Sequence, residues 1–405
     1  MSLNISRNAC LRVGISLLSA IVITAALFIA APEPANASNP QYINWQEYPA
    51  NPVFDPVERV YYPSIIFDGS TYKMWYDDGS GTRYSSSVDG ISWASGTSLA
   101  GLTNARHAVV QWIGTKYMAW YWNSTQLYSI NAIRTAESND GINWTFDAPI
   151  TQVGTTVITG ISGNWNGGSY GPCEVFYNPA GSATIVAPVD AATVWQNKFV
   201  MYYDGTTGGL EDIGIAVSAN GKQWQGYNGG TTPVLAHGGG TTWDSNYATF
   251  CSVQKIDGIY HMWYSGGQTA SHEGIGYAQS NDGITWTKYT GNPIMHRNDG
   301  VPWRSTRTYT PRVLYDAGGF NGQGEPAQLK MWYNGTDAAG NYALGYARIT
   351  ISPALVTVGG RVNPVNKIAI LMPYFYMIGG LVAVIAVGMF TWKKLSFARV
   401  NSRKN

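Results

Sequence analysis

A five-residue motif of apolar and aromatic residues, typical of a buried β-strand and called the aromatic phrase below, recurs five times along the chain. The copies are 72–76 (YKMWY), 117–121 (YMAWY), 199–203 (FVMYY), 260–264 (YHMWY) and 329–333 (LKMWY). Four of them are followed by a second strand and by S-x-D-G-x-x-W or a close variant, at 87–93, 138–144, 218–224 and 280–286. Such a repeat predicts a β-propeller, because one blade cannot bury both of its faces alone.

The fifth copy lacks the last strand of the repeat. After 344–347 (LGYA) the chain never reaches a D-G-x-x-W segment, whereas residues 43–54 (INWQEYPANPVF) match 284–295 (ITWTKYTGNPIM) in register. We expect this N-terminal segment to form the outer strand of the last blade, so that the ring has no open edge. The fold class predicted is therefore all-β, a five-bladed β-propeller closed by an N-terminal strand, over residues 38–352.

The Asp-Gly pairs of the repeat are predicted to be turn residues rather than catalytic ones. They fall between expected strands, where a tight hairpin needs a positive φ that the pair supplies. They are Asp68-Gly69, Asp89-Gly90, Asp140-Gly141, Asp257-Gly258, Asp282-Gly283 and the variant Asn220-Gly221. The Trp three residues after the Gly of each third-to-fourth-strand turn is expected to pack between neighbouring blades. Insertions at 151–168, 178–196 and 316–327 are expected to form loops at the funnel mouth.

The N-terminal end precedes the repeats. Arg7 and Arg12 come before an apolar run at 13–31, and Ala35-Asn36-Ala37 has the small residues of a cleavage site. Residues 1–37 are therefore predicted to be a secretory signal peptide, with an uncleaved anchor as the alternative.

The C-terminal end is expected to cross a membrane once. Residues 367–392 are apolar over about the length that a bilayer requires. They follow a linker at 353–366 and precede a basic tail at 393–405, which favours a cytoplasmic C-terminus. We predict a single-pass cell-membrane protein with its propeller extracellular, at the cell surface, and with the lipid bilayer as one partner.

Composition narrows the remaining partners. Charged residues make up only 12% of the chain and the net charge is +1. The composition therefore lacks the excess of basic residues that is typical of nucleic-acid-binding proteins. Aromatic residues reach 13%, which suits the flat faces of sugar rings. Cys173 and Cys251 fit no metal-binding spacing and occupy equivalent places in two repeats. A disulfide between them is one alternative in an oxidising compartment, and two separate buried thiols are the preferred one. No cofactor or metal site is predicted, although a divalent ion in the central channel is left open.

The starts of the inner strands are the expected ligand site. In a propeller the first strand of each blade faces the axis, and these starts would form one aromatic and polar collar. The predicted ligand-binding residues are Tyr61, Tyr62, Arg106, His107, Tyr170, Tyr247, Tyr309 and Arg312. Glu174 is the single carboxylate within these strand segments.

The chain resembles the five-bladed β-propeller glycoside hydrolases over residues 42–349. The resemblance lies in 63–76 (PSIIFDGSTYKMWY), in 276–286 (GYAQSNDGITW) and in the N-P-I and N-P-V segments. These are the arabinanase, levansucrase and invertase type, including families 43, 32, 68 and 130. The resemblance implies a glycan substrate or ligand and catalysis by inner-strand carboxylates, one as nucleophile or base and another, usually Glu, as acid.

The catalytic motifs of those families are incomplete in this chain. Family 43 typically has D-P-S in its first blade, where this chain has Tyr62-Pro63-Ser64. The R-D-P of invertases is Arg106-His107-Ala108, and their E-C pair is reversed in Cys173-Glu174. The catalytic candidates are accordingly Glu174 as general acid, with Asp55 or Asp244 as its partner.

Three functional hypotheses follow. The first is a membrane-anchored extracellular propeller that binds carbohydrate at its central funnel and has lost most of its catalytic carboxylates. The second is an active glycosidase or related glycan-processing enzyme with Glu174 as acid, so that the enzyme question stays open. The third is a structural or adhesive cell-envelope protein, favoured by the anchor and by sequons at Asn123, Asn143 and Asn334.

Overall fold

The described part of the chain is almost entirely β-structure. The computed structural model describes residues 40–351, except 57, 124–132, 150, 153–164, 270, 319 and 321–326. Its short 3-10 helices are Pro40–Tyr42 (η1), Val194–Gln196 (η2), Tyr227–Gly230 (η3) and Pro302–Arg304 (η4). The predicted signal peptide, linker, membrane span and cytoplasmic tail lie outside these residues. Within them, no helix has both the length and the apolar character that crossing a bilayer demands.

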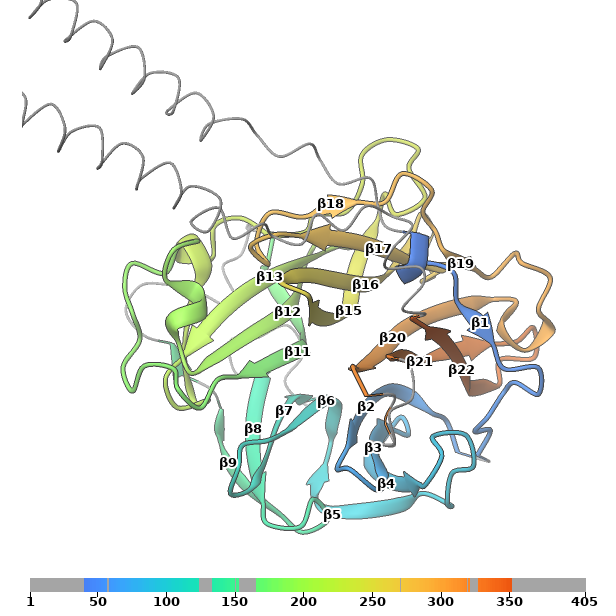
Figure 1. Ribbon diagram of the computed structural model, residues 1–405, viewed down its shortest axis with the longest axis horizontal. Coiled ribbons are helices and arrows are strands. Elements are labelled where there is room, and N and C mark those ends of the chain that lie inside the picture. The colour runs from blue at the N-terminus through green and yellow to red at the C-terminus, as the bar shows by residue number, and fades with distance from the viewer. Residues whose placement is uncertain are drawn as a thin grey trace, which may run out of the picture. The chain divides into compact units, whose positions relative to one another are not determined.

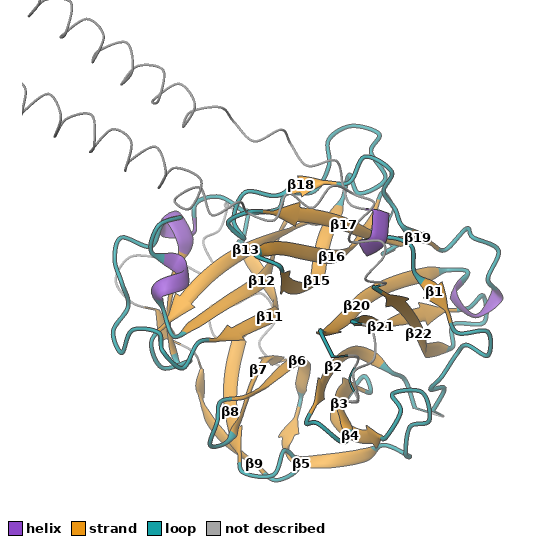
Figure 2. Ribbon diagram, viewed as in Figure 1, coloured by secondary structure: helices purple, strands orange, loops and turns teal. Residues whose placement is uncertain are grey.

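The strands form five antiparallel blades whose first strands surround one axis (Figure 1 and Figure 2). Blade 1 consists of β2 (Tyr61–Phe67), β3 (Tyr72–Asp77), β4 (Gly81–Ser87) and β5 (Thr97–Thr103). Blade 2 consists of β6 (Ala105–Trp112), β7 (Tyr117–Asn123), β8 (Ile133–Ser138) and β9 (Trp144–Pro149). Blade 3 consists of β11 (Gly168–Tyr177), β12 (Phe199–Thr207), β13 (Leu210–Ser218) and β14 (Gln223–Gly226), with β10 (Thr151–Gln152) beside β14.

Blade 4 consists of β15 (Tyr247–Ile256), β16 (Ile259–Gly267) and β17 (Gly274–Ser280), and β17 pairs with both β18 (Thr287–Lys288) and β19 (Met295–His296). Blade 5 consists of β20 (Arg307–Asp316), β21 (Gln328–Thr336), β22 (Tyr342–Thr350) and β1 (Gln46–Glu47). The strand order β1-β22-β21-β20 confirms that the N-terminal segment completes the last blade.

Two asparagines explain why the N-terminal segment matches the end of blade 4. Asn51 accepts a hydrogen bond from the backbone N–H of Tyr346 at 2.9 Å and donates one to its carbonyl at 3.0 Å. Asn292 makes the same two contacts with Tyr277, at 2.8 and 2.9 Å. In both blades the side chain thus pairs with the third strand as a backbone amide would. The regular part of β1 is shorter than the segment we predicted, and Trp45 lies just before it.

The aromatic phrase joins each blade to the next. The indole N–H of Trp75 donates to the carbonyl of Gly141 in blade 2, at 2.7 Å. The indole N–H groups of Trp120, Trp332 and Trp263 donate in the same way to the carbonyls of Gly221, Gly90 and Tyr42, respectively. In blade 3 the hydroxyl of Tyr202 donates instead, to the carbonyl of Gly283. The Trp after each turn packs on these rings, as in the pair Trp75–Trp144 with centroids 6.4 Å apart. The predicted packing between blades is confirmed.

The acidic residues of the Asp-Gly turns are structural, as predicted. Asp140 accepts hydrogen bonds from the backbone N–H groups of Ile142 and Asn143, each at 2.8 Å. These bonds hold the pKa of Asp140 below its usual value, because they favour the ionised form. Asp89 and Asp282 make equivalent bonds in their own turns.

One of the three predicted mouth loops lies at the opposite end of the propeller. Residues 178–196 connect β11 to β12. An inner strand starts at the mouth, and its antiparallel partner returns there, so the connection between them lies at the far end. The prediction that this insertion forms a mouth loop is therefore wrong. Most of each of the insertions at 151–168 and 316–327 lies outside the described residues.

Candidate functional site

The inner strands share an irregularity close to their mouth ends. The pairing register shifts between Tyr61 and Ser64 in blade 1, and comparable shifts interrupt β6, β11, β15 and β20. At each shift one residue has a positive φ: Tyr62 (47°), His107 (50°), Gly171 (117°), Phe250 (48°) and Thr310 (48°). Such backbone costs about 1–3 kcal/mol at a non-glycine residue and persists only where its surroundings enforce it. Bulges of this kind re-aim side chains beside functional sites.

Side chains from the neighbouring blade hold these bulges. The backbone N–H of Phe250 donates to Asp204 Oδ1 at 2.9 Å, that of Thr310 to Ser265 Oγ at 2.8 Å, and that of Tyr62 to Asn334 Oδ1 at 3.0 Å. Each acceptor directly follows the aromatic phrase of its blade. Asp77 occupies the same place in blade 1. In blades 3, 4 and 5 a polar residue directly after the phrase therefore supports the next blade's inner strand.

The bulges turn three rings toward the axis. Tyr62, His107 and Phe250 come from blades 1, 2 and 4, yet their ring centroids lie 3.3 Å (Tyr62–His107), 4.8 Å (Tyr62–Phe250) and 5.6 Å (His107–Phe250) apart. Residues of non-adjacent blades can meet in this way only at the centre of the ring. These axial rings form an aromatic floor across the funnel.

A small cavity adjoins the axial rings. Its volume is about 40 Å³, and Ser64, Val109, Cys173 and Arg312 are among its lining residues. A space of this size accommodates water rather than a sugar ring.

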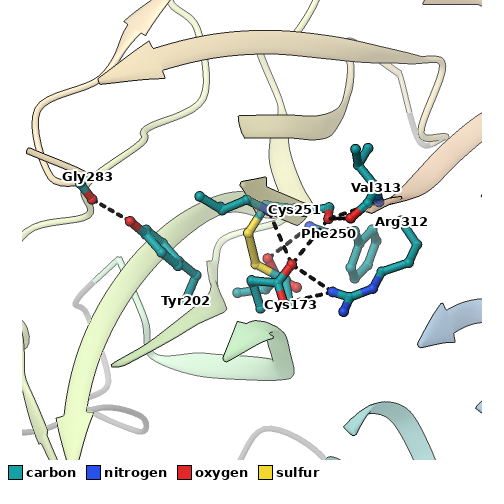
Figure 3. Close-up of a disulfide and its surroundings, with 11 residues drawn as sticks. Cys173, Tyr202, Phe250, Cys251, Gly283, Arg312 and Val313 are labelled. Carbon is teal, nitrogen blue, oxygen red and sulfur yellow. Dashed lines mark hydrogen bonds and ion pairs between the residues drawn. A yellow bond between two sulfur atoms is a disulfide. The ribbon is translucent and has the colours of Figure 1, made fainter. Parts of the chain in front are cut away.

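A disulfide joins Cys173 of β11 to Cys251 of β15, so the expectation of two separate thiols is wrong (Figure 3). The equivalent places of the two residues on adjacent inner strands bring their Cα atoms to 5.1 Å, within the range for a disulfide. The bond links blades 3 and 4 beside Phe250 and Arg312.

Glu174, the predicted general acid, lies inside the ring of inner strands rather than at the funnel mouth. It is 3% exposed, and Nη1 of Arg312 is 2.7 Å from each of its carboxylate oxygens. Ser252 Oγ and the N–H of Val253 also donate to Oε2, both at 3.2 Å. The carboxylate therefore ties blades 3, 4 and 5 together, and its role as an acid stays a prediction. Arg312, a predicted ligand residue, is likewise buried, and Figure 3 shows it close to the disulfide.

The two proposed partners of Glu174 have different surroundings. Asp244 is buried and accepts hydrogen bonds from Tyr264 Oη at 3.0 Å and Lys288 Nζ at 2.6 Å. Its neighbour Trp243 fills the space beside two strand glycines, as Trp165 and Trp303 do in blades 3 and 5. Asp55 is exposed and directly follows Phe54, which bridges to Leu344.

The mouth brings several predicted ligand residues together. Arg106 Nε lies 2.6 Å from Asp77 Oδ2, and the Tyr61 ring lies 6.0 Å from that of Tyr62. Tyr62, Arg106 and Tyr247 are partly exposed, whereas Tyr61, His107 and Tyr309 are buried. The side chain of Tyr170 is not among those that the structure describes.

Sequence reasoning missed four titratable residues at the mouth. Burial raises the pKa of Asp77 to about 6 despite the attraction of Arg106. Burial also raises the pKa of Asp204 well above its ordinary value. Glu211, at the start of β13, lies 3.1 Å from His272 Nε2. Asp77 and Asp204 could have been found as the residues that directly follow the aromatic phrase.

Metal binding gains no support from these groups. Across the described residues, no three or more His, Cys, Asp or Glu side chains gather in a way that could hold a metal ion.

The strand order and the closure of the last blade by β1 define a five-bladed β-propeller. No family model matches the sequence, and no curated protein is similar to it at the level of sequence. Among solved structures, a thermostable family-43 glycoside hydrolase is 17% identical, with a TM-score of 0.53, over 75% of this chain and 93% of its own. A glycosyl hydrolase from Bacteroides ovatus is 13% identical, with a TM-score of 0.51, over 75% of this chain and 93% of its own.

A third solved structure, a complex of BT0996 with RGII, is 17% identical, with a TM-score of 0.52, over 74% of this chain and 89% of its own. At these identities the likeness shows the fold alone. The resemblance to propeller glycoside hydrolases that the sequence predicted is thereby confirmed for the fold.

Proposed function

We propose that the propeller binds a carbohydrate on the mouth side of the axial rings and has lost the hydrolytic chemistry of its fold. The observation that carries this proposal is the identity of the axial residues. Tyr62 and His107 occupy the places where family 43 and the invertases have catalytic aspartates, and their rings pack together on the axis. An aromatic floor with a few convergent polar groups is the ordinary construction of a small-ligand site.

The rim supplies the polar groups. The Asp77–Arg106 pair, with 24% of the Arg106 side chain exposed, lies on one side, and the Glu211–His272 pair lies on another. Sugar hydroxyls both donate and accept hydrogen bonds, so carboxylates and guanidinium groups beside an aromatic face suit them. The RGII in the complex of one structural neighbour, BT0996, is compatible with a saccharide ligand here.

The binding proposal is tested by removing one axial ring from the full-length protein. Tyr62→Gly deletes the ring without backbone strain, because glycine adopts a positive φ freely, and Tyr62→Phe keeps the ring. On a glycan panel we expect at least about tenfold weaker binding for the Gly variant and near-normal binding for the Phe variant. Trp112→Ala, an exposed residue at the far end of β6, is the control. Equal binding by both Tyr62 variants would refute the site.

A second candidate function is glycan hydrolysis, and the raised pKa of Asp77 favours it. A carboxyl group that holds its proton toward pH 6 meets the requirement for a general acid. If the protein hydrolyses glycosides, Asp77→Asn or Glu174→Gln should nearly abolish turnover while binding remains measurable. Whichever substitution abolishes it identifies the acid, and the absence of turnover by the wild type on the whole panel leaves the binding proposal.

We also propose that the propeller is extracellular and anchored in the cell membrane by residues 367–392. The basic tail after the apolar run and the disulfide between Cys173 and Cys251 support this, since disulfides persist in oxidising compartments. Protease added to intact cells should remove the propeller and spare a tag placed after Asn405. Loss of the tag with survival of the propeller would reverse the topology.

A further inference from the structure

Three arginines gather at one side of the funnel mouth, each over an aromatic ring. The guanidinium carbon of Arg59 is 5.4 Å from the centroid of Tyr342, that of Arg106 is 5.6 Å from Trp122, and that of Arg307 is 5.8 Å from Tyr309. Arg59 lies just before β2, Arg106 near the start of β6, and Arg307 at the start of β20. All three therefore stand at the mouth ends of blades 1, 2 and 5, which are consecutive around the ring.

The rings between these arginines pack into one continuous layer, in which Tyr61 and Tyr309 are buried. Tyr61 lies 4.4 Å from Tyr342 and 6.0 Å from Tyr62, and Tyr62 in turn lies 6.3 Å from Tyr309, measured between centroids. Stacking on an aromatic face limits the motion of a guanidinium group and leaves its N–H edges available for a ligand. The three arginines thus form a prearranged cationic surface that borders the axial rings.

Two of the three arginines have uncompensated charge. Arg106 is paired with Asp77 at 2.6 Å. In contrast, neither Arg59 nor Arg307 forms an ion pair with any carboxylate that the structure describes. The acidic neighbour of Arg59 in the sequence, Glu58, is instead bound to Arg83 at 3.2 Å. Arg59 is exposed and Arg307 partly exposed, so both can reach a ligand.

We infer that the saccharide bound at the mouth is anionic, and that Arg59 and Arg307 bind the carboxylate of a uronic-acid unit. This rests on the proposed carbohydrate function and names its ligand class. The fork of a guanidinium group matches the two oxygens of a carboxylate, which gives such a contact geometric specificity as well as charge. Asp77 holds Arg106 in place, so Arg106 contributes a fixed hydrogen-bond donor at the edge of the same surface.

The experiment compares matched acidic and neutral ligands on the full-length protein in detergent. Oligomers of galacturonate, glucuronate and mannuronate, each with its fully methyl-esterified form, are titrated by calorimetry. We expect at least one acid to bind about tenfold or more tightly than its ester, which keeps every atom of the sugar ring but lacks the charge. The preference should shrink as salt rises from 0.05 to about 0.5 M.

Substitutions of single arginines test which side chains bind the carboxylate. Arg59→Gln and Arg307→Gln should each reduce the acid-over-ester preference several-fold, and the lysine variants should keep part of it because charge remains without the fork. Arg348→Gln, at an exposed arginine near the far end of β22, is the matched control and should change nothing. Thermal unfolding checks that each variant is folded.

The outcomes separate this inference from the function on which it rests. Equal affinity for acids and esters, or a preference that survives in both glutamine variants, would overturn the anionic ligand and leave carbohydrate binding intact. Equally tight binding of an oligosaccharide whose sugars lack carboxylates but carry sulfate groups would replace carboxylate recognition with recognition of charge alone. Failure of the wild type to bind any acidic or neutral saccharide would overturn the proposed function itself.

Discussion

Glu174 and Arg312 come from blades 3 and 5 and meet in an ion pair that solvent scarcely reaches, with Nη1 2.7 Å from both carboxylate oxygens. The pair spans the interior of the ring of inner strands, where both side chains are buried. Two charges so placed are tolerated only while both remain, because removing one leaves the other buried and unpaired. This relationship makes the first prediction one about stability.

Glu174→Ala should lower the free energy of unfolding by about 3–5 kcal/mol, because it leaves the Arg312 guanidinium buried without its carboxylate partner. The double variant Glu174→Gln, Arg312→Met should lose less than the single variant, since no buried charge is left over. Urea denaturation followed by tryptophan fluorescence measures both. A double variant that is less stable than Glu174→Ala would show that the pair itself contributes net stability.

Reduction of the disulfide should destabilise the propeller without opening the ring. The bond closes a segment of 78 residues, for which the chain-entropy model gives about 4–5 kcal/mol. The paired variant Cys173→Ser, Cys251→Ser should therefore unfold at a lower temperature than the oxidised wild type. The melting temperature with and without dithiothreitol measures the effect, and the serine variant, which should not respond to the reductant, is the control.

Gly141→Ala should cost more than an ordinary glycine substitution. Gly141 has φ of +79°, and a Cβ there would lie 2.8 Å from the Trp75 ring of the neighbouring blade. The expected loss is about 2–4 kcal/mol, which combines backbone strain with a clash between blades. Gly258→Ala is the matched control, because it has φ of +88° with nothing within 4 Å of its Cβ. Its loss should be confined to about 1–2 kcal/mol.

Asp77 should make the stability of the protein depend on pH in the mildly acidic range. Its pKa is about 6 in the folded protein and 3.8 in the unfolded chain, because burial disfavours the charged form. The folded state therefore binds the proton more tightly. The contribution of Asp77 to the free energy of unfolding, about 2–3 kcal/mol, is fully present below about pH 4. It is lost as the pH rises toward about 6.

Asp77→Asn removes this titration. Urea denaturation at several pH values between 4 and 7 should show that the variant changes less over this range than the wild type does. Identical pH profiles of the two proteins would mean that Asp77 titrates normally, and would also remove the observation that favours the hydrolase alternative.

Local chemistry determined most of the architecture from the sequence alone. The aromatic phrase and the Asp-Gly turns recur with a fixed spacing, and turn geometry and strand burial depend on residues close together in the chain. The missing last strand of the fifth repeat predicted the closure by residues 43–54, because an unpaired edge strand had only one matching segment elsewhere, and within this segment Gln46–Glu47 form β1. Sequence reasoning also predicted the turn role of Asp140, whose carboxylate accepts hydrogen bonds from the backbone N–H groups of Ile142 and Asn143.

The tertiary structure alone decided the chemistry of the mouth. Positive φ angles at Tyr62 and Phe250 cannot be read from residue types that seldom adopt them, since hydrogen bonds from the adjacent blade hold them. The disulfide, the buried partner of Glu174 and the carboxylate of Asp77 depend on which strands become neighbours around the axis. Residue types determined the blades, and closing them into a ring determined which side chains meet at its centre.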